Sequence, residues 1–277
     1  MVAENSYHSL TGHAMTGGNG LKSYTRNSSY QAPEFIGYQK PNSAIANKLQ
    51  PKNLTTLDTF SVADLGCSIG PNTFFVVQNI LESVKLKYKT HDPNSKVPGF
   101  QVFFNDHSMN DFNTLFKCLL PDREYYALGL LGSFYSCLFL RRSLHIVHSS
   151  YSFHWLSQVP KEVTNRKGLI DKEKVDSFNV PAYCTCPQEL EVVIEFSIEK
   201  MESLSTVIAP DTRHRPQDVS LSIRAITKEL IREQFLAEIL DELFHLFTKK
   251  VGEVHQDRAS RIAPNLFLLL KHKTYIN

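Results

Sequence analysis

The chain has 277 residues, is nearly neutral and is moderately apolar, which excludes several classes of protein. Hydrophobic residues make up 42% and charged residues 21%, and the formal net charge is +2. These values are typical of a globular chain with a substantial buried core and not of a disordered one. Because Lys and Arg are scattered among Asp and Glu, the sequence contains no basic stripe of the kind that binds nucleic-acid phosphates.

Cysteine usage and hydropathy favour a cytoplasmic protein. Five cysteines, an odd number spread over a long chain, do not resemble the disulfide framework of a small secreted domain. Residues 1–30 are polar and glycine-rich, and no later apolar run reaches the roughly eighteen residues of a membrane span. We therefore expect a cytoplasmic location, with neither a membrane nor a nucleic acid as partner.

The first readable unit in the chain is a strand followed by a glycine loop and a helix. Residues 60–64 are a β-compatible run that leads into Asp64-Leu-Gly-Cys-Ser-Ile-Gly-Pro-Asn-Thr73. In residues 74–87 the apolar positions recur at spacings of three and four, as an amphipathic helix requires. The loop lacks the glycine spacing of dinucleotide sites and the Lys-Ser/Thr ending of phosphate loops. A dinucleotide or nucleoside triphosphate is therefore disfavoured.

Similar units follow along the chain. A second apolar run, 100–104, closes on Asn105-Asp106, and Asn110 or Asp111 could cap a helix after it. Alternating strands and helices favour an open α/β sheet, in which ligands bind beyond the carboxyl ends of the strands. Further strand candidates are 144–147, 190–196 and 265–270, a long helix is predicted over 231–251, and 210–216 is predicted to be an irregular connection.

Two aspartates stand at the ends of predicted strands. Asp64 could accept hydrogen bonds from an amine or hydroxyl group, and Asp106 could accept them from a ribose diol. Each residue alone is equally well explained as a helix cap. The pair is a stronger indication of a ligand site than either member.

Five motifs stand out along the chain: Met15–Gln31, Asp64–Thr73, Phe103–Asn113, Gly132–Tyr135 and Ser149–Pro160. In this order they resemble the motifs of the plant SABATH methyltransferases, which methylate salicylate, benzoate, jasmonate, loganate and related acids. A sixth stretch, 168–183, is also similar to the family. The resemblance implies a Rossmann-like α/β sheet that binds S-adenosyl-L-methionine (SAM), with a helical cap that is truncated here.

The resemblance also assigns roles to particular residues. It implies that Ser28 and Asp64 hold the methionine end of SAM, that Asp106 holds the ribose, and that Ser133 and Phe134 surround the adenine. The complete set implied for the cofactor is Tyr24, Ser28, Asp64, Asp106, His107, Ser133 and Phe134. The set implied for a small carboxylic acid substrate is Gln31, Tyr151, His154 and Trp155. Without the motifs, Trp155 would be as well explained as a core residue and Gln31 as a surface residue.

The implied reaction requires no general base. A carboxylate with a pKa of about 4.3 is already ionised at neutral pH, so the protein must mainly position two reactants and exclude water. The side-chain amide of Gln31 and the indole N–H of Trp155 are neutral donors that suit this task. We expect neither a catalytic dyad nor a metal, since His145-x-x-His148 and Cys184-Thr-Cys186 do not match a zinc site.

The chain departs from the family in the middle. The resemblance implies a long helix, a further core strand and the start of a cap after the fifth motif, and about 80 to 100 residues of this are absent between Val159 and Gly168. We expect residues 1–160 to carry the core with the cofactor site, 161–230 a remnant of the cap and a core strand, and 231–277 a C-terminal helix and strand.

Three functions are consistent with these features. The first is carboxyl O-methylation of a small hydrophobic acid, carried out by a monomer or a homodimer. The second is a catalytically inactive truncated relative that binds a ligand or a dimer partner, since loss of an internal strand exposes unpaired sheet edges. The third is N-methylation of a purine alkaloid.

Overall fold

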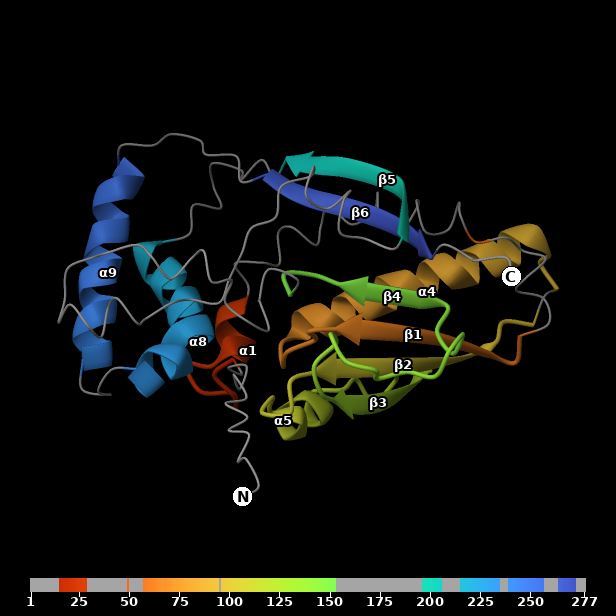
Figure 1. Ribbon diagram of the computed structural model, residues 1–277, viewed down its shortest axis with the longest axis horizontal. Helices are drawn as coiled ribbons and strands as arrows, with labels where there is room; N and C mark the ends of the chain where they lie inside the picture. Colours follow the sequence, from red (N-terminus) through yellow and green to blue (C-terminus); the bar gives the residue numbers. More distant parts are fainter. Residues whose placement is uncertain are drawn as a thin grey trace, which may run out of the picture.

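The computed structural model describes residues 15–28, 49, 57–94, 96–152, 196–205, 215–234, 239–256 and 264–272. Strands and helices alternate over the first half of the chain, and this α/β arrangement confirms the expected fold class (Figure 1). The elements are, in chain order, α1 Tyr24–Asn27, β1 Thr59–Leu65, α4 Pro71–His91, β2 Gly99–Asp106, α5 Phe112–Lys117, β3 Tyr125–Leu131, β4 Ile146–Ser149, β5 Phe196–Ser205, α8 Pro216–Gln234, α9 Ile239–Gln256 and β6 Pro264–His272.

The central element is a four-stranded sheet in the order β3-β2-β1-β4, in which every pair of neighbours is parallel. All four strands therefore end at the same edge. Parallel neighbours are joined by crossover connections, and α4 is the long crossover helix between β1 and β2. In Figure 1 it lies along one face of the sheet.

The core between the sheet and α4 explains why these segments fold as they do. Alternate residues of β1 and β2 point toward α4, and Phe60, Val62 and Val102 are fully buried there. The helix begins at Pro71, whose fixed φ suits a first helical position. Its apolar stripe contributes Val77, Ile80, Leu81 and Val84 to the same cluster.

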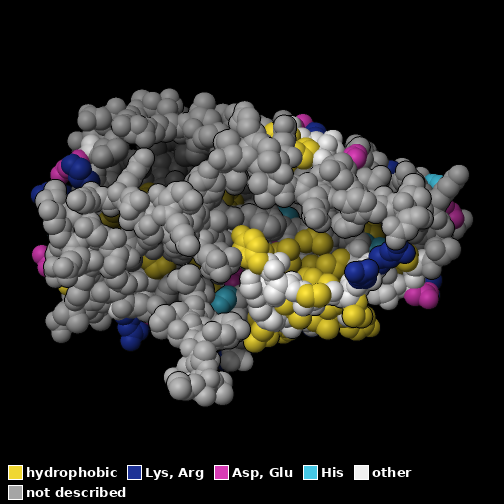
Figure 2. All heavy atoms as spheres, in the orientation of Figure 1, with side chains coloured by type: hydrophobic (Ala, Val, Ile, Leu, Met, Phe, Trp, Pro, Cys, Tyr) yellow, Lys and Arg dark blue, Asp and Glu magenta, His cyan; other side chains and the backbone are white. Residues whose placement is uncertain are grey.

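The opposite face of the four-stranded sheet is apolar and open to solvent within the described part of the chain. Figure 2 views this face and shows hydrophobic side chains gathered over the strands. Tyr126 on β3 is 76% exposed and Val147 on β4 is 53% exposed. Part of this face is covered, since the Phe103 ring on β2 packs edge-on against the Phe139 ring at a centroid distance of 5.6 Å, whereas Tyr126 and Val147 stay exposed.

Several predicted elements agree with the structure and others do not. The predicted runs at 60–64, 100–104 and 265–270 lie within β1, β2 and β6. The single helix predicted over 231–251 is wrong, because this region belongs to two helices, α8 and α9. Apolar residues of both helices, Ile231, Leu240 and Phe244, form one cluster.

Other strand boundaries were misplaced or missed. Strand β4 begins at Ile146, two residues after the predicted start, and β5 begins at Phe196, where the predicted strand ends. Residues 190–195 lie outside the described residues. The sequence did not predict β3 or the α8 turns that start at Pro216.

The C-terminal elements form a second unit beside the first. Strands β5 and β6 pair antiparallel in a separate two-stranded sheet. Helix α8 contacts the N-terminal segment: Ser222 Oγ donates to the carbonyl of Asn27 at 2.6 Å, and the amide of Thr16 donates to the carbonyl of Ala225 at 2.9 Å. Among the described helices, none combines the length and apolar character needed to cross a membrane.

Candidate functional site

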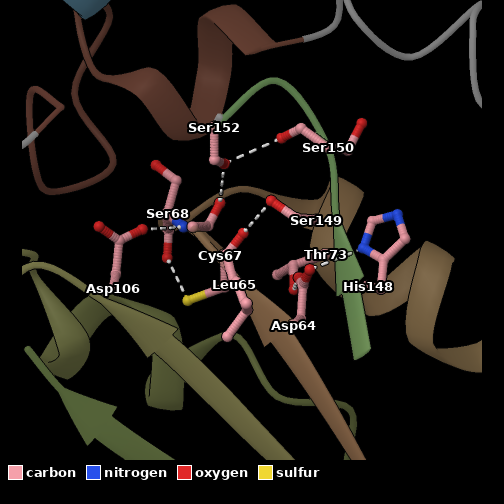
Figure 3. Close-up of polar contacts among 11 residues, drawn as sticks. Asp64, Leu65, Cys67, Ser68, Thr73, Asp106, His148, Ser149, Ser150 and Ser152 are labelled. Atoms are coloured by element: carbon pink, nitrogen blue, oxygen red, sulfur yellow. Dashed lines mark hydrogen bonds and ion pairs between the residues drawn. The ribbon is translucent and has the colours of Figure 1, made fainter. Parts of the chain in front are cut away.

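The carboxyl ends of the parallel strands bring together three polar side chains that are far apart in the sequence. Asp64 stands near the end of β1, Asp106 ends β2, and His148 lies on β4. The strand register places His148 directly opposite Asp64 (Figure 3). This edge of an open α/β sheet is where such folds bind ligands.

Asp64 is held from two sides. The residue is 4% exposed; one carboxylate oxygen, Oδ1, lies 2.7 Å from His148 Nδ1, and the other, Oδ2, accepts a hydrogen bond from Thr73 Oγ1. Thr73 belongs to the first turn of α4, where the helix dipole favours a negative charge nearby. The site therefore stabilises a buried carboxylate with a fixed orientation.

The loop between β1 and α4 requires glycine at two positions. Gly66 has a φ of +78°, and a Cβ there would collide with the side chain of Ser152. A Cβ on Gly70 would lie 2.9 Å from Ser28 Oγ. The glycines let Ser28 and Ser152 approach the loop backbone closely.

Asp106 closes the other side of this loop. Its Oδ2 accepts a hydrogen bond from the Ser68 amide at 2.6 Å, and its Oδ1 accepts one from the His107 amide at 2.7 Å. Burial raises the pKa of Asp106 to about 6, the two backbone hydrogen bonds oppose this shift, and the charge of Asp64 adds to it. The carboxylate is thus mostly ionised at neutral pH but costly to keep charged.

Two buried hydroxyl groups beside the loop have no hydrogen-bond partner among the described residues. Ser28 is 2% exposed and Ser68 is 8% exposed, and the Oγ of each is unpaired. An unpaired buried polar group costs about 1–3 kcal/mol, so such groups commonly mark a ligand site. Ser68 also has a φ of +52°, which is unusual for a residue with a side chain.

A small cleft opens beside these groups. Among the residues expected to bind the cofactor or substrate, Tyr24, Asp64 and Tyr151 line it. Ser28, Asp106, His107, Ser133 and Phe134 are not among its lining residues. The other lining residues are Gly66, Cys67, Ser68, Gly70, Asn72, Thr73, Val76, His148 and Ser150.

The residues expected around the adenine lie next to Asp106 through backbone contacts. The amide of Gly132 donates to the carbonyl of Asp106 at 2.9 Å, and Ser133 and Phe134 follow immediately. Asn105, which is fully buried, fixes this turn by donating to the carbonyls of Leu130 and Gly132 at 2.8 and 3.0 Å. The order of the strands therefore places the ends of β2 and β3 side by side.

Three of the residues expected to contact substrate lie outside the described residues: Gln31, His154 and Trp155. Tyr151 lines the cleft and has a φ of +55°. Backbone strain of this kind is often found at functional sites. The geometry of the expected acid-binding residues is thus defined only at Tyr151.

Comparison with known proteins identifies the family. The family model described as SAM dependent carboxyl methyltransferase matches residues 11–167 and 164–273. The chain belongs to this family. The donor is therefore SAM. The residues at the sheet edge fit it, because the buried hydroxyls of Ser28 and Ser68 have no hydrogen-bond partner among the described residues. In addition, a Cβ at Gly66 or Gly70 would collide with a neighbouring serine side chain, so the loop leaves no room for further side chains.

Individual relatives in the SAM-dependent carboxyl methyltransferase family cover most of the chain. Loganic acid O-methyltransferase of Catharanthus roseus is 33% identical over 94% of this chain and 94% of its own length. Farnesoic acid carboxyl-O-methyltransferase of Arabidopsis thaliana is 47% identical over 58% of this chain and 45% of its own length. A solved structure of loganic acid methyltransferase with SAH (S-adenosylhomocysteine) matches with a TM-score of 0.85 and 31% identity, over 94% of this chain and 99% of that one.

These comparisons also confirm an internal deletion in this carboxyl methyltransferase. The alignment with the Catharanthus enzyme runs over 357 positions, whereas the chain has 277 residues, so the relative carries at least 80 positions that this chain lacks. The two matched parts of the family model meet at residues 164–167. The break lies where it was expected, between Val159 and Gly168.

Some residues at the site of this methyltransferase were missed by sequence reasoning. Ser68 and Thr73 lie within a motif that was recognised, but only the structure gives their contacts with Asp106 and Asp64. The sequence places His148 only in the His145-x-x-His148 pair, which does not match a zinc site. Its position at the end of a predicted strand, like that of Asp64, was the signal that could have identified it.

Proposed function

We propose that this chain transfers the methyl group of SAM to the carboxylate of a small hydrophobic acid and releases a methyl ester. The observation that carries the proposal is the pair of carboxylates at the ends of adjacent parallel strands, Asp64, which is buried, and Asp106, which is half-buried. The unpaired hydroxyl of Ser28 beside the glycine loop supports the same assignment. Family membership supplies the reaction class.

The proposed cofactor site divides into three parts. Ser28, Asp64 and Tyr24 would hold the methionine end, where the clamped carboxylate of Asp64 offers an acceptor to an ammonium group. Asp106 and His107 would receive the ribose diol. Ser133 and Phe134 would flank the adenine, since they follow the turn fixed by Asn105.

When bound, SAM would supply a methyl group that is attached to a positively charged sulfur. The sulfur would keep the electron pair of the broken C–S bond. The chain's residues need not remove a proton, because the acceptor acid is already ionised at neutral pH. Their proposed task is to hold and orient both reactants and to exclude water. Gln31, Tyr151, His154 and Trp155 are proposed to bind the acid, of which Tyr151 lines the cleft.

The acceptor is proposed to be a small apolar acid. Support comes from two relatives, whose names give loganic acid and farnesoic acid as their substrates.

We also propose that the chain forms a homodimer in the cytoplasm. Cys67, Cys118 and Cys137 are free thiols, as a reducing compartment would require.

The first experiment is calorimetric titration of the purified chain with SAH. We expect saturable binding by the wild type and its loss in Asp64→Ala and Asp106→Ala. Asp122→Ala, which removes an exposed carboxylate away from the sheet edge, serves as the matched control and should bind normally. Absence of binding by a folded wild-type chain would sink the proposal.

A second candidate function is a relative that binds the cofactor without turnover. It is favoured by the 357 aligned positions against 277 residues, because the missing part includes a segment expected to shape the acid site. The two functions separate when the wild type is incubated with SAM carrying a labelled methyl group and a panel of small acids. Labelled ester supports the enzyme, whereas SAH binding with no ester from any acid supports the inactive relative.

A further inference from the structure

His148 makes a direct contact with Asp64, the residue whose carboxylate is proposed to bind the cofactor. No role is yet assigned to His148. The imidazole Nδ1 lies 2.7 Å from Asp64 Oδ1, and both side chains are largely buried, at 15% and 5% exposure. A distance of 2.7 Å requires a proton between the two atoms. Because a carboxylate is the acceptor, Nδ1–H is the donor.

The sheet itself fixes this contact. Asp64 on β1 and His148 on β4 are register partners in a parallel pair, so their side chains leave the sheet on the same face. The β4 chain is tied to β1 beyond this point as well: Ser149 Oγ donates to the Leu65 carbonyl at 3.0 Å, and Ser152 Oγ donates to the Gly66 carbonyl at 3.3 Å (Figure 3).

His148 and Thr73 approach different oxygens of the same carboxylate. Thr73 comes from α4 and binds Oδ2, whereas His148 comes from β4 and binds Oδ1. Together they define the rotamer of Asp64. Without His148, the carboxylate would be held from the helix side alone, and the buried charge would lose one of its two side-chain hydrogen bonds.

We propose that His148 is a positioning residue that acts on cofactor affinity through Asp64. This inference rests on the proposed function, since it assumes that Asp64 contacts the cofactor. His148 thereby joins the donor site of the methyl-transfer reaction without contacting the reacting atoms. Strand β4 then contributes to cofactor binding through a side chain and not only as a sheet neighbour.

Two variants of His148 and one matched control test the inference. His148→Ala removes the donor and should weaken SAH binding about tenfold, the size expected for a hydrogen bond to a buried charge. His148→Asn keeps an N–H donor near the Nδ1 position and should restore most of the affinity. His145→Ala is the control, because that imidazole accepts a hydrogen bond from the Ser61 amide at 3.0 Å and does not touch Asp64.

A double-mutant cycle separates positioning from a general loss of stability. In an Asp64→Asn background, His148→Ala should leave the residual SAH affinity unchanged, whereas a purely structural role would lower it by the same factor as in the wild type. Equal SAH affinity of wild type and His148→Ala would overturn the inference while leaving the proposed function standing.

A spectroscopic readout covers the case in which the wild type does not bind SAH. The His148 Nδ1 proton should give a far-downfield NMR resonance that Asp64→Asn abolishes and His145→Ala retains. Failure of SAH binding would then count against the proposed function, and absence of the resonance would count against the His148–Asp64 contact itself.

Discussion

The Asp106 carboxylate illustrates at the scale of one residue how a site can be prepared for a ligand. Burial and the nearby charge of Asp64 raise its pKa from 3.8 to about 6, although two backbone amides donate to it. The folded chain therefore binds this proton more tightly than the unfolded chain. The stability that this provides is complete below pH 3.8 and is lost as the pH rises through about 6.

Cofactor affinity should increase as the pH rises, whereas the contribution of Asp106 to stability decreases. In the proposed site the ribose hydroxyls donate to the ionised Asp106, so SAH binding there would expel a proton at acid pH. We expect the dissociation constant to be flat above pH 7 and to rise by about tenfold per pH unit below the Asp106 pKa. Calorimetric titrations between pH 5 and pH 8 would measure this. The profile should persist in His148→Asn, which removes the nearby imidazole, and a flat profile in the wild type would contradict the assigned role.

Residue-scale prediction from sequence succeeded where position along a strand was enough. Asp64 and Asp106 were identified because each closes an apolar run, and the structure brings both to one edge of the sheet. Ser28 required the family resemblance, since an isolated serine carries no signal. His148 and Ser68 were missed because their contacts depend on strand register and on a positive φ, neither of which can be read from residue types.

Helix α5 shows how a short element is stabilised by the residue that precedes it. Asp111 caps it: Oδ1 accepts from the Thr114 amide at 2.9 Å, and Oδ2 accepts from Thr114 Oγ1 at 2.7 Å. Oδ2 also accepts from the Gly18 amide at 2.9 Å, which joins the N-terminal segment to the helix. The hydrogen bonds from Thr114 contribute most to holding the pKa of Asp111 below its ordinary value.

Loss of this cap should be measurable as a loss of stability. Asp111→Ala removes a cap and the contact with Gly18, and we expect the free energy of unfolding to fall by about 1–2 kcal/mol. Urea denaturation at pH 7 would measure it. Asp111→Asn is the control, because asparagine also caps helices. The difference between wild type and Asp111→Ala should begin to shrink as the pH falls below 3.8 and should be lost as the pH falls through the lowered pKa of the folded Asp111 carboxyl.

Element-scale prediction depended on the clarity of the turn signals. Strands β1 and β2 were found because glycine or polar residues end them abruptly. Strand β3 has Tyr-Tyr-Ala-Leu-Gly-Leu-Leu as its sequence, with an internal glycine and no clean alternation, so it was not predicted. Helices α8 and α9 were merged because apolar residues of both enter one cluster and the spacing alone contains no stop.

At the scale of the whole molecule, the described part of the four-stranded sheet has an open edge. Strand β4 pairs with β1 on one side, and no described strand pairs with its other edge. On the face away from α4, Tyr126 and Val147 are exposed, and Figure 2 shows hydrophobic side chains gathered over the strands. The expected division at residues 160 and 230 stays a prediction, but the separate β5-β6 sheet is consistent with a lost strand between the two units.

This open face should promote self-association. We expect light scattering to give a mass above that of the monomer, and we expect the double substitution Tyr126→Ser with Val147→Thr to reduce it toward the monomer mass. Both side chains are exposed, so the unfolding midpoint should change little. Leu86→Ser, on the helix that covers the other face, is the matched control and should not alter the mass. A monomeric wild type would contradict this expectation.

The exposed face of β4 and its neighbours also bears on how long the protein survives in a cell. Chaperones and proteases recognise apolar surface and unpaired strand edges, and they continuously remove chains that display them. A methyltransferase with an intact donor site can therefore have little effect on metabolism because few copies persist. For this chain, faster removal by quality control would lower ester production by lowering the number of molecules present.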